Sequence, residues 1–346
     1  MTSDDAWQRP RLRWAIDTAA TPGRWGDLWG DTHFAESLAR ALRRLGQQVT
    51  IDRRDTRDRA SRAEDDVVLA LRGLEIGPPQ PGAVNFLWVI SHPDEVVADE
   101  ARRYDAVFAA GPRWARERGD EWGLAITPLL QCTDRELCRP DRATGAAPDT
   151  SGRVLFIGNA RRGGHRPLVE AAARDADVAI IGTGWENTPQ ARRLVATSVP
   201  NADVGAHYAA ARVVLNDHWA DMRRAGFVSN RLFDAVACGA RVLSDPIDGL
   251  AELFDDSVVA REAAEEIAAV LDADPDQVWP ARERRLATAE QVRSEHSFDR
   301  RAATLLEHAV ALRTSAAPAA ASDRPAPASR RWWWPGRSDS GRQVMK

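Results

Sequence analysis

The chain has 346 residues, of which 28% are charged and 44% hydrophobic, and its formal net charge is −4. This composition is typical of a globular protein, and the length suits two domains that each have a core. The slight negative charge argues against general nucleic-acid binding, so no nucleic-acid partner is expected. Only three cysteines are present, without a Cys-x-x-Cys pair, which argues against a disulfide framework and a structural zinc site.

The two ends of the chain bear on its location. The N-terminus lacks the basic and apolar regions of a signal peptide, and no apolar run approaches the roughly 20 residues that span a bilayer. We therefore expect a cytoplasmic protein. Residues 315–346 are rich in Ala, Pro and Ser, so a disordered tail is expected. Within it, Trp332-Trp333-Trp334 beside arginines suits either peripheral contact with an anionic membrane surface or a solvated tail.

The first half of the chain alternates predicted strands and helices. Residues 12–16 predict a strand, 21–31 a glycine-rich loop, and 34–45 a helix with apolar residues at helical spacing. Further strands are expected at 49–51, 67–70, 84–90 and 106–110, with a weaker candidate at 124–126. This order predicts a parallel α/β sheet, which binds ligands at the carboxyl ends of its strands.

Two segments place polar residues at that edge of the sheet. The strand at 84–90 leads into His92, which could act as a base or contact a sugar, while Asp94 and Glu95 could be first-turn helix acids. The glycine-rich loop brings Gly30 and Asp31 to the same edge, unless it is only a connection. Its glycines do not follow the G-x-G-x-x-G spacing, so a dehydrogenase is disfavoured.

The strand–loop–helix pattern restarts after residues 140–152, which have the composition of a linker. We therefore expect an N-terminal Rossmann-like acceptor domain at 1–139 and a C-terminal Rossmann-like domain at 153–287. A C-terminal helix at 288–314 could pack back across the N-terminal domain.

The second domain opens with a strand at 154–158 and a glycine loop that carries Arg161 and Arg162. Arginines in a loop before a helix suit a diphosphate, although two solvated surface arginines are the alternative. The next strand leads to Gly184 and Trp185, and the tryptophan could stack on a base or pack a loop.

Residues 226–245 form the most informative stretch, a polar loop, a short helix, a glycine stop and a buried strand. Ser229 or Asn230 can cap the helix, and Gly239 suits the left-handed position after it. A helix start that carries Arg231 suits an anion, and Asp234 lies one turn further in as a hydroxyl acceptor. Together these features suit a nucleotide sugar.

These segments resemble the nucleotide-sugar domain of group 1 glycosyltransferases, whose GT-B fold has two facing Rossmann-like domains. The most specific match is Asn230-Arg231-Leu232-Phe233-Asp234-Ala235-Val236-Ala237-Cys238-Gly239-Ala240. Phe156-Ile157-Gly158 with the two arginines, Ile181-Gly182-Thr183-Gly184-Trp185 and the segment 30–39 also match, so the resemblance covers about residues 11–312.

The resemblance implies a role for each candidate residue. The donor diphosphate would be bound by Arg161, Arg162, Asn230 and Arg231, and the ribose and base by Asp234, Gly184 and Trp185. The donor sugar or the cleft would involve His218, Ser229, Gly30 and Asp31. His33 and His92 are the candidates for acceptor activation, although His33 could instead pack on the first helix. The donor is a nucleotide-diphosphate sugar, the acceptor a glycan, lipid-linked sugar or cell-surface precursor, and no metal or other cofactor is expected.

One position departs from the family. The family has two glutamates separated by seven residues around this helix; Asp234 occupies the second position, and Gly226 the first. The departure leaves open which residue contacts the donor sugar and whether the reaction retains or inverts the anomeric configuration. It also supports the alternative of a non-catalytic nucleotide-sugar-binding or scaffold protein.

Overall fold

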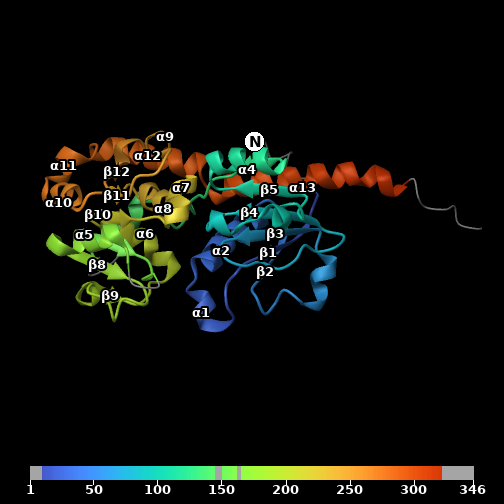
Figure 1. Cartoon of the computed structure of the whole chain (residues 1–346), viewed down its shortest axis with the longest axis horizontal. Helices are drawn as coiled ribbons and strands as arrows, with labels where there is room; N and C mark the ends of the chain where they lie inside the picture. Colours follow the sequence, from blue (N-terminus) through green and yellow to red (C-terminus); the bar gives the residue numbers. More distant parts are fainter. Residues whose placement is uncertain (1–9, 145–149, 162–164, 322–346) are drawn as a thin grey trace, which may run out of the picture.

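The computed structural model describes residues 10–144, 150–161 and 165–321. Two six-stranded sheets stand side by side, and each is covered by helices on both faces (Figure 1). All the strand pairs within both sheets are parallel. The predicted fold class, two facing Rossmann-like domains, is confirmed.

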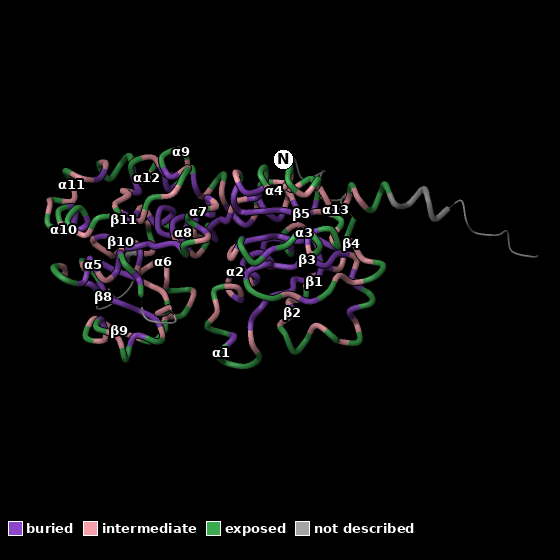
Figure 2. Tube along the Cα trace, in the orientation of Figure 1, coloured by how far each residue is buried: buried purple, intermediate pink, exposed green. Residues whose placement is uncertain are grey.

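The N-terminal sheet has the strand order β2-β1-β3-β4-β5-β6. Its strands are β1 Arg13–Asp17, β2 Gln48–Asp52, β3 Val67–Arg72, β4 Val84–Val89, β5 Ala106–Ala109 and β6 Ile126–Pro128. Its helices are α1 Gly23–Asp27, α2 Gly30–Arg44, η2 Ala60–Glu64, η3 Pro93–Glu95, α3 Ala98–Ala101 and α4 Pro112–Trp122. Every residue of β3 is buried (Figure 2), because helices cover both faces of the sheet.

The C-terminal sheet has the order β12-β11-β10-β7-β8-β9. Its strands are β7 Val154–Ile157, β8 Val178–Ile181, β9 Leu194–Ala196, β10 Val213–Asn216, β11 Val242–Ser244 and β12 Val258–Ala260. Its helices are α5 Pro167–Asp175, η5 Ala191–Arg193, α6 Asn201–Ala210, α7 Ala220–Ala225, α8 Asn230–Ala237, α9 Leu250–Phe254, η6 Asp255–Ser257, α10 Ala264–Asp272, α11 Pro275–Val278 and α12 Arg282–Glu295. The short edge strand β9 was not predicted, since three residues carry little periodicity.

The chain crosses between the domains at Thr133 and returns beside it at Ser297. These two residues form an isolated parallel bridge, with hydrogen bonds from Thr133 N to His296 O (2.9 Å) and from Phe298 N to Thr133 O (3.1 Å). The crossing therefore precedes the predicted linker at 140–152. Part of that linker is instead the short helix η4 Pro140–Thr144, which packs on α6 of the C-terminal domain.

The expected C-terminal helix at 288–314 is also divided differently. The helix α12 packs on α8 of the C-terminal domain, and a new helix, α13 Phe298–Ala321, packs on α2 of the N-terminal domain. Buried Phe298, Leu305 and Leu306 of α13 join the core of the N-terminal domain, so this helix does pack back across it. The break at 296–297 falls at the crossing, where the chain changes domain.

Two further segments differ from prediction. The glycine-rich loop at 21–31 contains the helix α1, and α2 already begins at Gly30. The helix α13 continues to Ala321, so the first seven residues of the tail predicted from 315 are helical. The segment Trp332-Trp333-Trp334 lies outside the described residues. Among the helices of the described residues, none has the length and apolar character to cross a bilayer.

Candidate functional site

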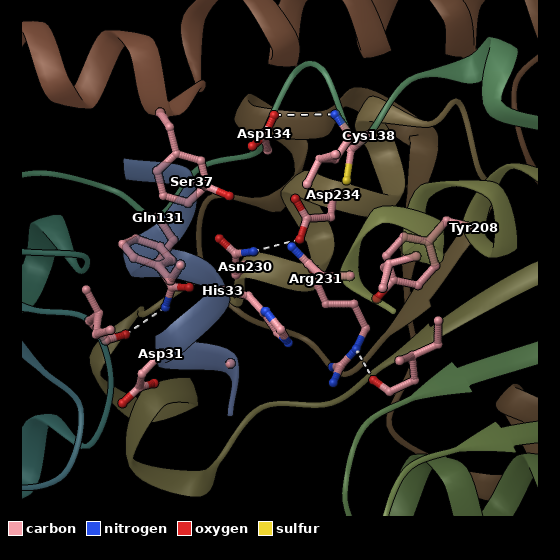
Figure 3. Close-up of a pocket in the computed structure, with 18 of the residues that line it drawn as sticks. Asp31, His33, Ser37, Gln131, Asp134, Cys138, Tyr208, Asn230, Arg231 and Asp234 are labelled. Atoms are coloured by element: carbon pink, nitrogen blue, oxygen red, sulfur yellow. Dashed lines mark hydrogen bonds between the residues drawn. The ribbon is translucent and has the colours of Figure 1, made fainter. Parts of the chain in front are cut away.

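A cavity of about 310 Å³ lies between the two domains, where α2 of one faces α8 of the other (Figure 3). A second cavity of about 250 Å³ adjoins it along the carboxyl ends of β7 and β8. The two share the lining residues Gly30, His33, Ile157, Asn201, Val204 and Arg231. We call Asn230, Arg231 and Asp234 of α8 the C-terminal wall, and Asp31, His33 and Ser91 the N-terminal wall.

The helix α8 forms where the sequence predicts it. Leu232, Phe233 and Val236 are buried in the core of the C-terminal domain, and Gly239 is left-handed after the last turn (φ +72°). The start of the helix differs from the prediction in one detail. Ser229 is the N-cap residue, but its side chain makes no capping hydrogen bond, and its backbone N–H instead donates to His218 Nε2 at 3.1 Å.

His218 is therefore a structural support of α8. Its side chain is fully buried, and Nδ1 lies 2.6 Å from Asp245 Oδ1 while Nε2 accepts from Ser229 N. Because Nε2 accepts, Nδ1 carries the proton and donates it to Asp245. The hydrogen bond from His218 holds the pKa of Asp245 below its ordinary value, against the effect of burial. His218 does not line either interdomain cavity and instead borders a separate one, so its predicted place at the donor sugar or the cleft stays a prediction.

Arg231 is the arginine that the structure brings to both cavities. Its Nε donates to Ile157 O (3.0 Å) and its Nη1 to Asn216 Oδ1 (2.8 Å), and the guanidinium lies 4.7 Å from the centre of the Phe156 ring. Among the described residues, Nη2 has no hydrogen-bond partner. A rigidly held fork with one free edge is suited to a phosphate oxygen.

Two further arginines add positive charge behind Arg231. Arg166 pairs with Asp217 and lies 4.9 Å from the centre of the Phe156 ring. Burial lowers the pKa of Arg166 to about 10, and repulsion from Arg231 and Arg161 adds to this effect. Sequence reasoning missed Arg166, although its position directly before the helix-starting Pro167 was a usable signal.

The other predicted arginines lie differently. Arg161 donates to His218 O (2.7 Å), lies 3.4 Å from Asp217 Oδ2 and covers the Trp219 ring at 4.4 Å. It lines a separate cavity of about 260 Å³ instead of the two interdomain cavities. Arg162 lies outside the described residues. Of the four predicted diphosphate ligands, Asn230 and Arg231 therefore line the larger interdomain cavity.

Asp234 lies one turn into α8 and faces the same cavity. Its two oxygens accept from Thr133 Oγ1 and Asn230 Nδ2, each at 2.7 Å (Figure 3 shows the second bond). Burial raises the pKa of Asp234 to about 7, although the hydrogen bond from Thr133 opposes the shift. The Oδ1 atom of Asn230 is buried and has no partner among the described residues, so the cavity offers an unused acceptor beside a carboxylate.

The N-terminal wall comes from the first turn of α2 and the end of β4. His33 lines both cavities, and its Nδ1 makes no hydrogen bond within the described residues, with Glu36 Oε2 at 3.6 Å. Gly30 also lines both cavities, and Asp31 lines the larger one. Three predicted site residues of α2, two for the cleft and one for acceptor activation, thus come together opposite α8, as Figure 3 shows for Asp31 and His33.

His92 lies beside the cavity rather than on it. It has a left-handed backbone (φ 50°, ψ 51°) before η3, and its side chain contacts residues of the C-terminal domain. There its ring contacts the Trp219 ring at 5.4 Å, and Nδ1 lies 3.7 Å from Asp221 Oδ2. The neighbouring Ser91, which was not predicted as a site residue, lines the cavity instead.

Trp185, which could stack on a base or pack a loop, lines neither interdomain cavity. Its side chain is fully buried, donates from Nε1 to Gly158 O (2.9 Å) and packs on Phe156 at 5.9 Å between ring centres. Gly184 also lies away from both cavities, close to Ala160. Gly158 and Gly182 line the smaller cavity instead, and their backbones pack closely, because a Cβ added at Gly182 would lie 2.2 Å from Gly158 O.

The structure also explains the departure at Gly226. This glycine is the left-handed C-cap of α7 (φ +75°), and no atom lies within 4 Å of an added Cβ. The next residue, Phe227, is fully buried in the core of the N-terminal domain and packs on Trp114 at 5.8 Å between ring centres. The segment before α8 is thus anchored in the opposite domain, and Gly226 does not line the interdomain cavities.

Comparison with known proteins agrees with this architecture. Residues 161–307 match a family described as glycosyl transferase-like. AviGT4, a glycosyltransferase of avilamycin A biosynthesis, superposes with a TM-score of 0.60 at 17% identity, over 87% of this chain and 98% of its own. Alr3699/HepE from Anabaena superposes with a TM-score of 0.59 at 13% identity, and the match covers 86% of this chain and 100% of that one. Sucrose-phosphate synthase from Thermosynechococcus elongatus superposes with a TM-score of 0.50 at 12% identity, and the match covers 90% of this chain and 100% of that one.

The predicted resemblance to group 1 glycosyltransferases with the GT-B fold is confirmed by these matches. At such low identities the solved structures establish the fold alone. No curated protein sequence matches the chain. Among the described residues, no group of three or more His, Cys, Asp and Glu side chains could hold a metal ion.

Proposed function

We propose that this protein is a glycosyltransferase that moves a sugar from a nucleotide-diphosphate donor to an acceptor bound between the two domains. The single observation that carries the proposal is Arg231, held by Ile157 O and Asn216 with one edge free at the cavity. In glycosyl transfer, negative charge develops on the departing diphosphate, and a fixed guanidinium stabilises it without reorganising. Arg166 and Arg161 add to the positive potential there.

The remaining donor contacts follow from the C-terminal wall. Asp234 and the free Oδ1 of Asn230 are acceptors for the ribose hydroxyls, and the cavity beside Gly182 has room for the rest of the nucleotide. One structure of similar fold was determined in complex with UDP-glucose, which supports a nucleotide sugar as the donor class. His33 and His92 remain the predicted candidates for acceptor activation. Leaving-group stabilisation by arginine is consistent with a reaction that needs no metal or other cofactor.

The proposed acceptor is a glycan, a lipid-linked sugar or a cell-surface precursor, and the proposed location is the cytoplasm. Peripheral membrane contact would come from Trp332-Trp333-Trp334. Deleting residues 322–346 leaves all described helices intact and should reduce co-sedimentation with anionic liposomes. Unchanged sedimentation would contradict the membrane contact and leave the transferase proposal in place.

The test of the function is release of nucleoside diphosphate from a panel of nucleotide sugars, with candidate acceptors present. We expect release with at least one donor, and loss of it in Arg231→Ala and Asp234→Ala. Asp99→Ala is the matched control, because this carboxylate is 96% exposed on the far helix α3.

The alternative function is nucleotide-sugar binding without chemistry, and the absence of an acid at Gly226 favours it. Binding of a nucleotide by thermal shift, with no release of diphosphate across the panel, would favour this alternative. A ligand at about 100 times its dissociation constant stabilises the folded state by about 2.7 kcal/mol, so the shift is measurable.

A further inference from the structure

Arg231 is held from behind by a chain of buried hydrogen bonds that leads away from the cavity. Its Nη1 donates to Asn216 Oδ1 (2.8 Å), and Nδ2 of the same amide donates to Ser244 Oγ (2.9 Å). Ser244 Oγ in turn donates to Asp245 Oδ1 at 3.2 Å. Asn216 and Ser244 end the neighbouring strands β10 and β11, where they pair in register, and both are fully buried. Neither lines the interdomain cavities, so neither contacts a ligand bound there.

The chain of bonds returns to the helix from which it starts. Asp245 accepts from His218 Nδ1 (2.6 Å) and from His218 N (3.0 Å), and His218 Nε2 accepts from Ser229 N (3.1 Å). Ser229 is the N-cap residue of α8, the helix that carries Arg231, so the backbone of α8 closes a ring. We call it the α8 ring, and its members are Ser229, Arg231, Asn216, Ser244, Asp245 and His218. The ring fixes the start of the helix and the guanidinium of its arginine at the same time.

The arginine sets the direction of the bonds between itself and Asp245. A guanidinium only donates, so the oxygen of the Asn216 amide faces Arg231 and the amide nitrogen faces Ser244. The Ser244 hydroxyl accepts from that nitrogen and therefore donates its own proton to Asp245. Burial would raise the pKa of Asp245, but the hydrogen bonds from His218 and Ser244 hold it below its ordinary value. The chain thus ends on an ionised carboxylate, and each of its members has one arrangement of donors and acceptors.

A single arrangement matters for an arginine that faces a phosphate. An unrestrained guanidinium loses rotamer freedom when it binds a ligand, and a guanidinium that is already held does not. Hydrogen bonds in a buried chain also polarise one another, so removing one member weakens the others. A change at Ser244, which lies away from the cavity, should therefore reach the phosphate through Asn216 and Arg231.

We propose that Asn216 and Ser244 are positioning residues for the diphosphate of the donor, and that they act through Arg231 without touching the ligand. The inference rests on the proposed function in placing a nucleoside diphosphate at this arginine. The effect is specific to the phosphates, because the α8 ring holds the guanidinium and the helix start. The nucleoside would lie in the cavity beside Gly182, which the ring does not line.

The experiment measures binding, which does not depend on turnover. Wild type is titrated with UDP, ADP, GDP and CDP by ligand-observed NMR, and the tightest diphosphate is then compared with its own nucleoside in each variant. In Ser244→Ala, we expect the dissociation constant of the diphosphate to rise about 10-fold and that of the nucleoside to change less than about twofold. Retained nucleoside binding also shows that the variant is folded. Ser244→Thr keeps the hydroxyl, so much of the diphosphate affinity should return.

A matched control and a second variant complete the comparison. Ser257→Ala also removes a fully buried hydroxyl from the C-terminal domain, but one without a hydrogen-bond partner among the described residues. It should leave both dissociation constants within about twofold of wild type. Asn216→Ala should weaken the diphosphate at least as much as Ser244→Ala does. Because both residues belong to one chain of bonds, the double variant should lose less than the product of the two single losses.

Each other outcome overturns a defined part. Unchanged diphosphate affinity in Ser244→Ala contradicts the positioning role, and equal losses for diphosphate and nucleoside reduce the α8 ring to a general support of the domain. Wild type that binds none of the diphosphates removes the phosphate from Arg231, and the positioning residues with it. Wild type that binds a diphosphate with the expected pattern in the variants, but releases none from any nucleotide sugar, contradicts the transferase alone and leaves the positioning role in place.

Discussion

The two walls of the interdomain cavity are built in opposite ways. On the C-terminal wall, the guanidinium of Arg231 and the carboxylate of Asp234 are held by hydrogen bonds to neighbouring residues. On the N-terminal wall, Asp31 and the Nδ1 atom of His33 have no hydrogen-bond partner among the described residues. A fixed guanidinium stabilises a departing anion without reorganising, whereas polar groups that have no partner in the protein remain available to a ligand. Under the proposed function, this difference suits the C-terminal wall to the donor diphosphate and leaves the N-terminal wall open to the acceptor.

The largest expected effect tests the fixed character of the C-terminal wall. Arg231→Lys keeps the charge but cannot bond Ile157 O and Asn216 together while also facing a phosphate. We expect kcat/KM for the donor to fall about 100-fold, or about 2.7 kcal/mol of transition-state stabilisation. Arg102→Lys, on an exposed surface of the N-terminal domain, is the control. A fall of less than threefold would mean that charge alone is needed, and the contrast between the walls would be lost.

The second test concerns His218, whose hydrogen bonds hold the start of α8 behind the C-terminal wall. His218→Ala leaves the N–H of Ser229 and the carboxylate of Asp245 without their partner, so the free energy of unfolding should fall by about 2–3 kcal/mol in urea titrations. Nucleotide affinity should fall too, because α8 loses the bond that places its start. In His218→Gln, an amide oxygen can accept from Ser229, so part of both losses should be recovered. Unchanged affinity in the alanine variant would separate His218 from the site.

The third test uses the pH dependence of Asp234. Its folded pKa of about 7 exceeds the ordinary value of 3.8, so the folded protein keeps a proton that the unfolded chain loses first. Stability should therefore fall as pH rises between these two values, by about 2 kcal/mol once the partial solvent access of the side chain is considered. Nucleotide affinity should rise over the same range, because the ionised form accepts ribose hydroxyls.

The matched variant for this test is Asp234→Asn, which cannot ionise. Its stability should depend less on pH than that of wild type, and its nucleotide affinity should not rise through pH 7, as measured by calorimetry. The same slopes in variant and wild type would assign the titration to another group.

The smallest effect concerns a residue behind the wall. Trp185→Phe keeps a ring against Phe156 but removes the donor to Gly158 O, which should cost about 1 kcal/mol of stability. Nucleotide affinity should be unchanged, because the ring does not reach the cavities. A large loss of affinity with unchanged stability would restore Trp185 as a base-stacking residue.

The sequence by itself determined the elements that depend on local pattern. Alternating buried strands and amphipathic helices predicted both parallel sheets, and the run from Asn230 to Gly239 predicted α8 with its glycine stop. Arg231 and Asp234 could be placed on that helix because helical spacing fixes their positions three residues apart. The same local signals located Gly30, Asp31 and His33 at the edge of the first sheet.

Only the tertiary structure decided which of these side chains are free. The Trp185 side chain donates a hydrogen bond to Gly158 O, 27 residues away in the sequence. The His218 side chain donates one to Asp245, also 27 residues away. The crossing at Thr133 depends on a bridge to Ser297, which no local composition encodes. Asp31 stands out for the opposite reason, because no described residue donates a hydrogen bond to it, although the attraction of His92 acts on its carboxylate. Hydrogen bonds between residues far apart in the sequence determine which polar groups remain available to a ligand. These bonds depend on how the two domains pack, which local sequence patterns do not encode.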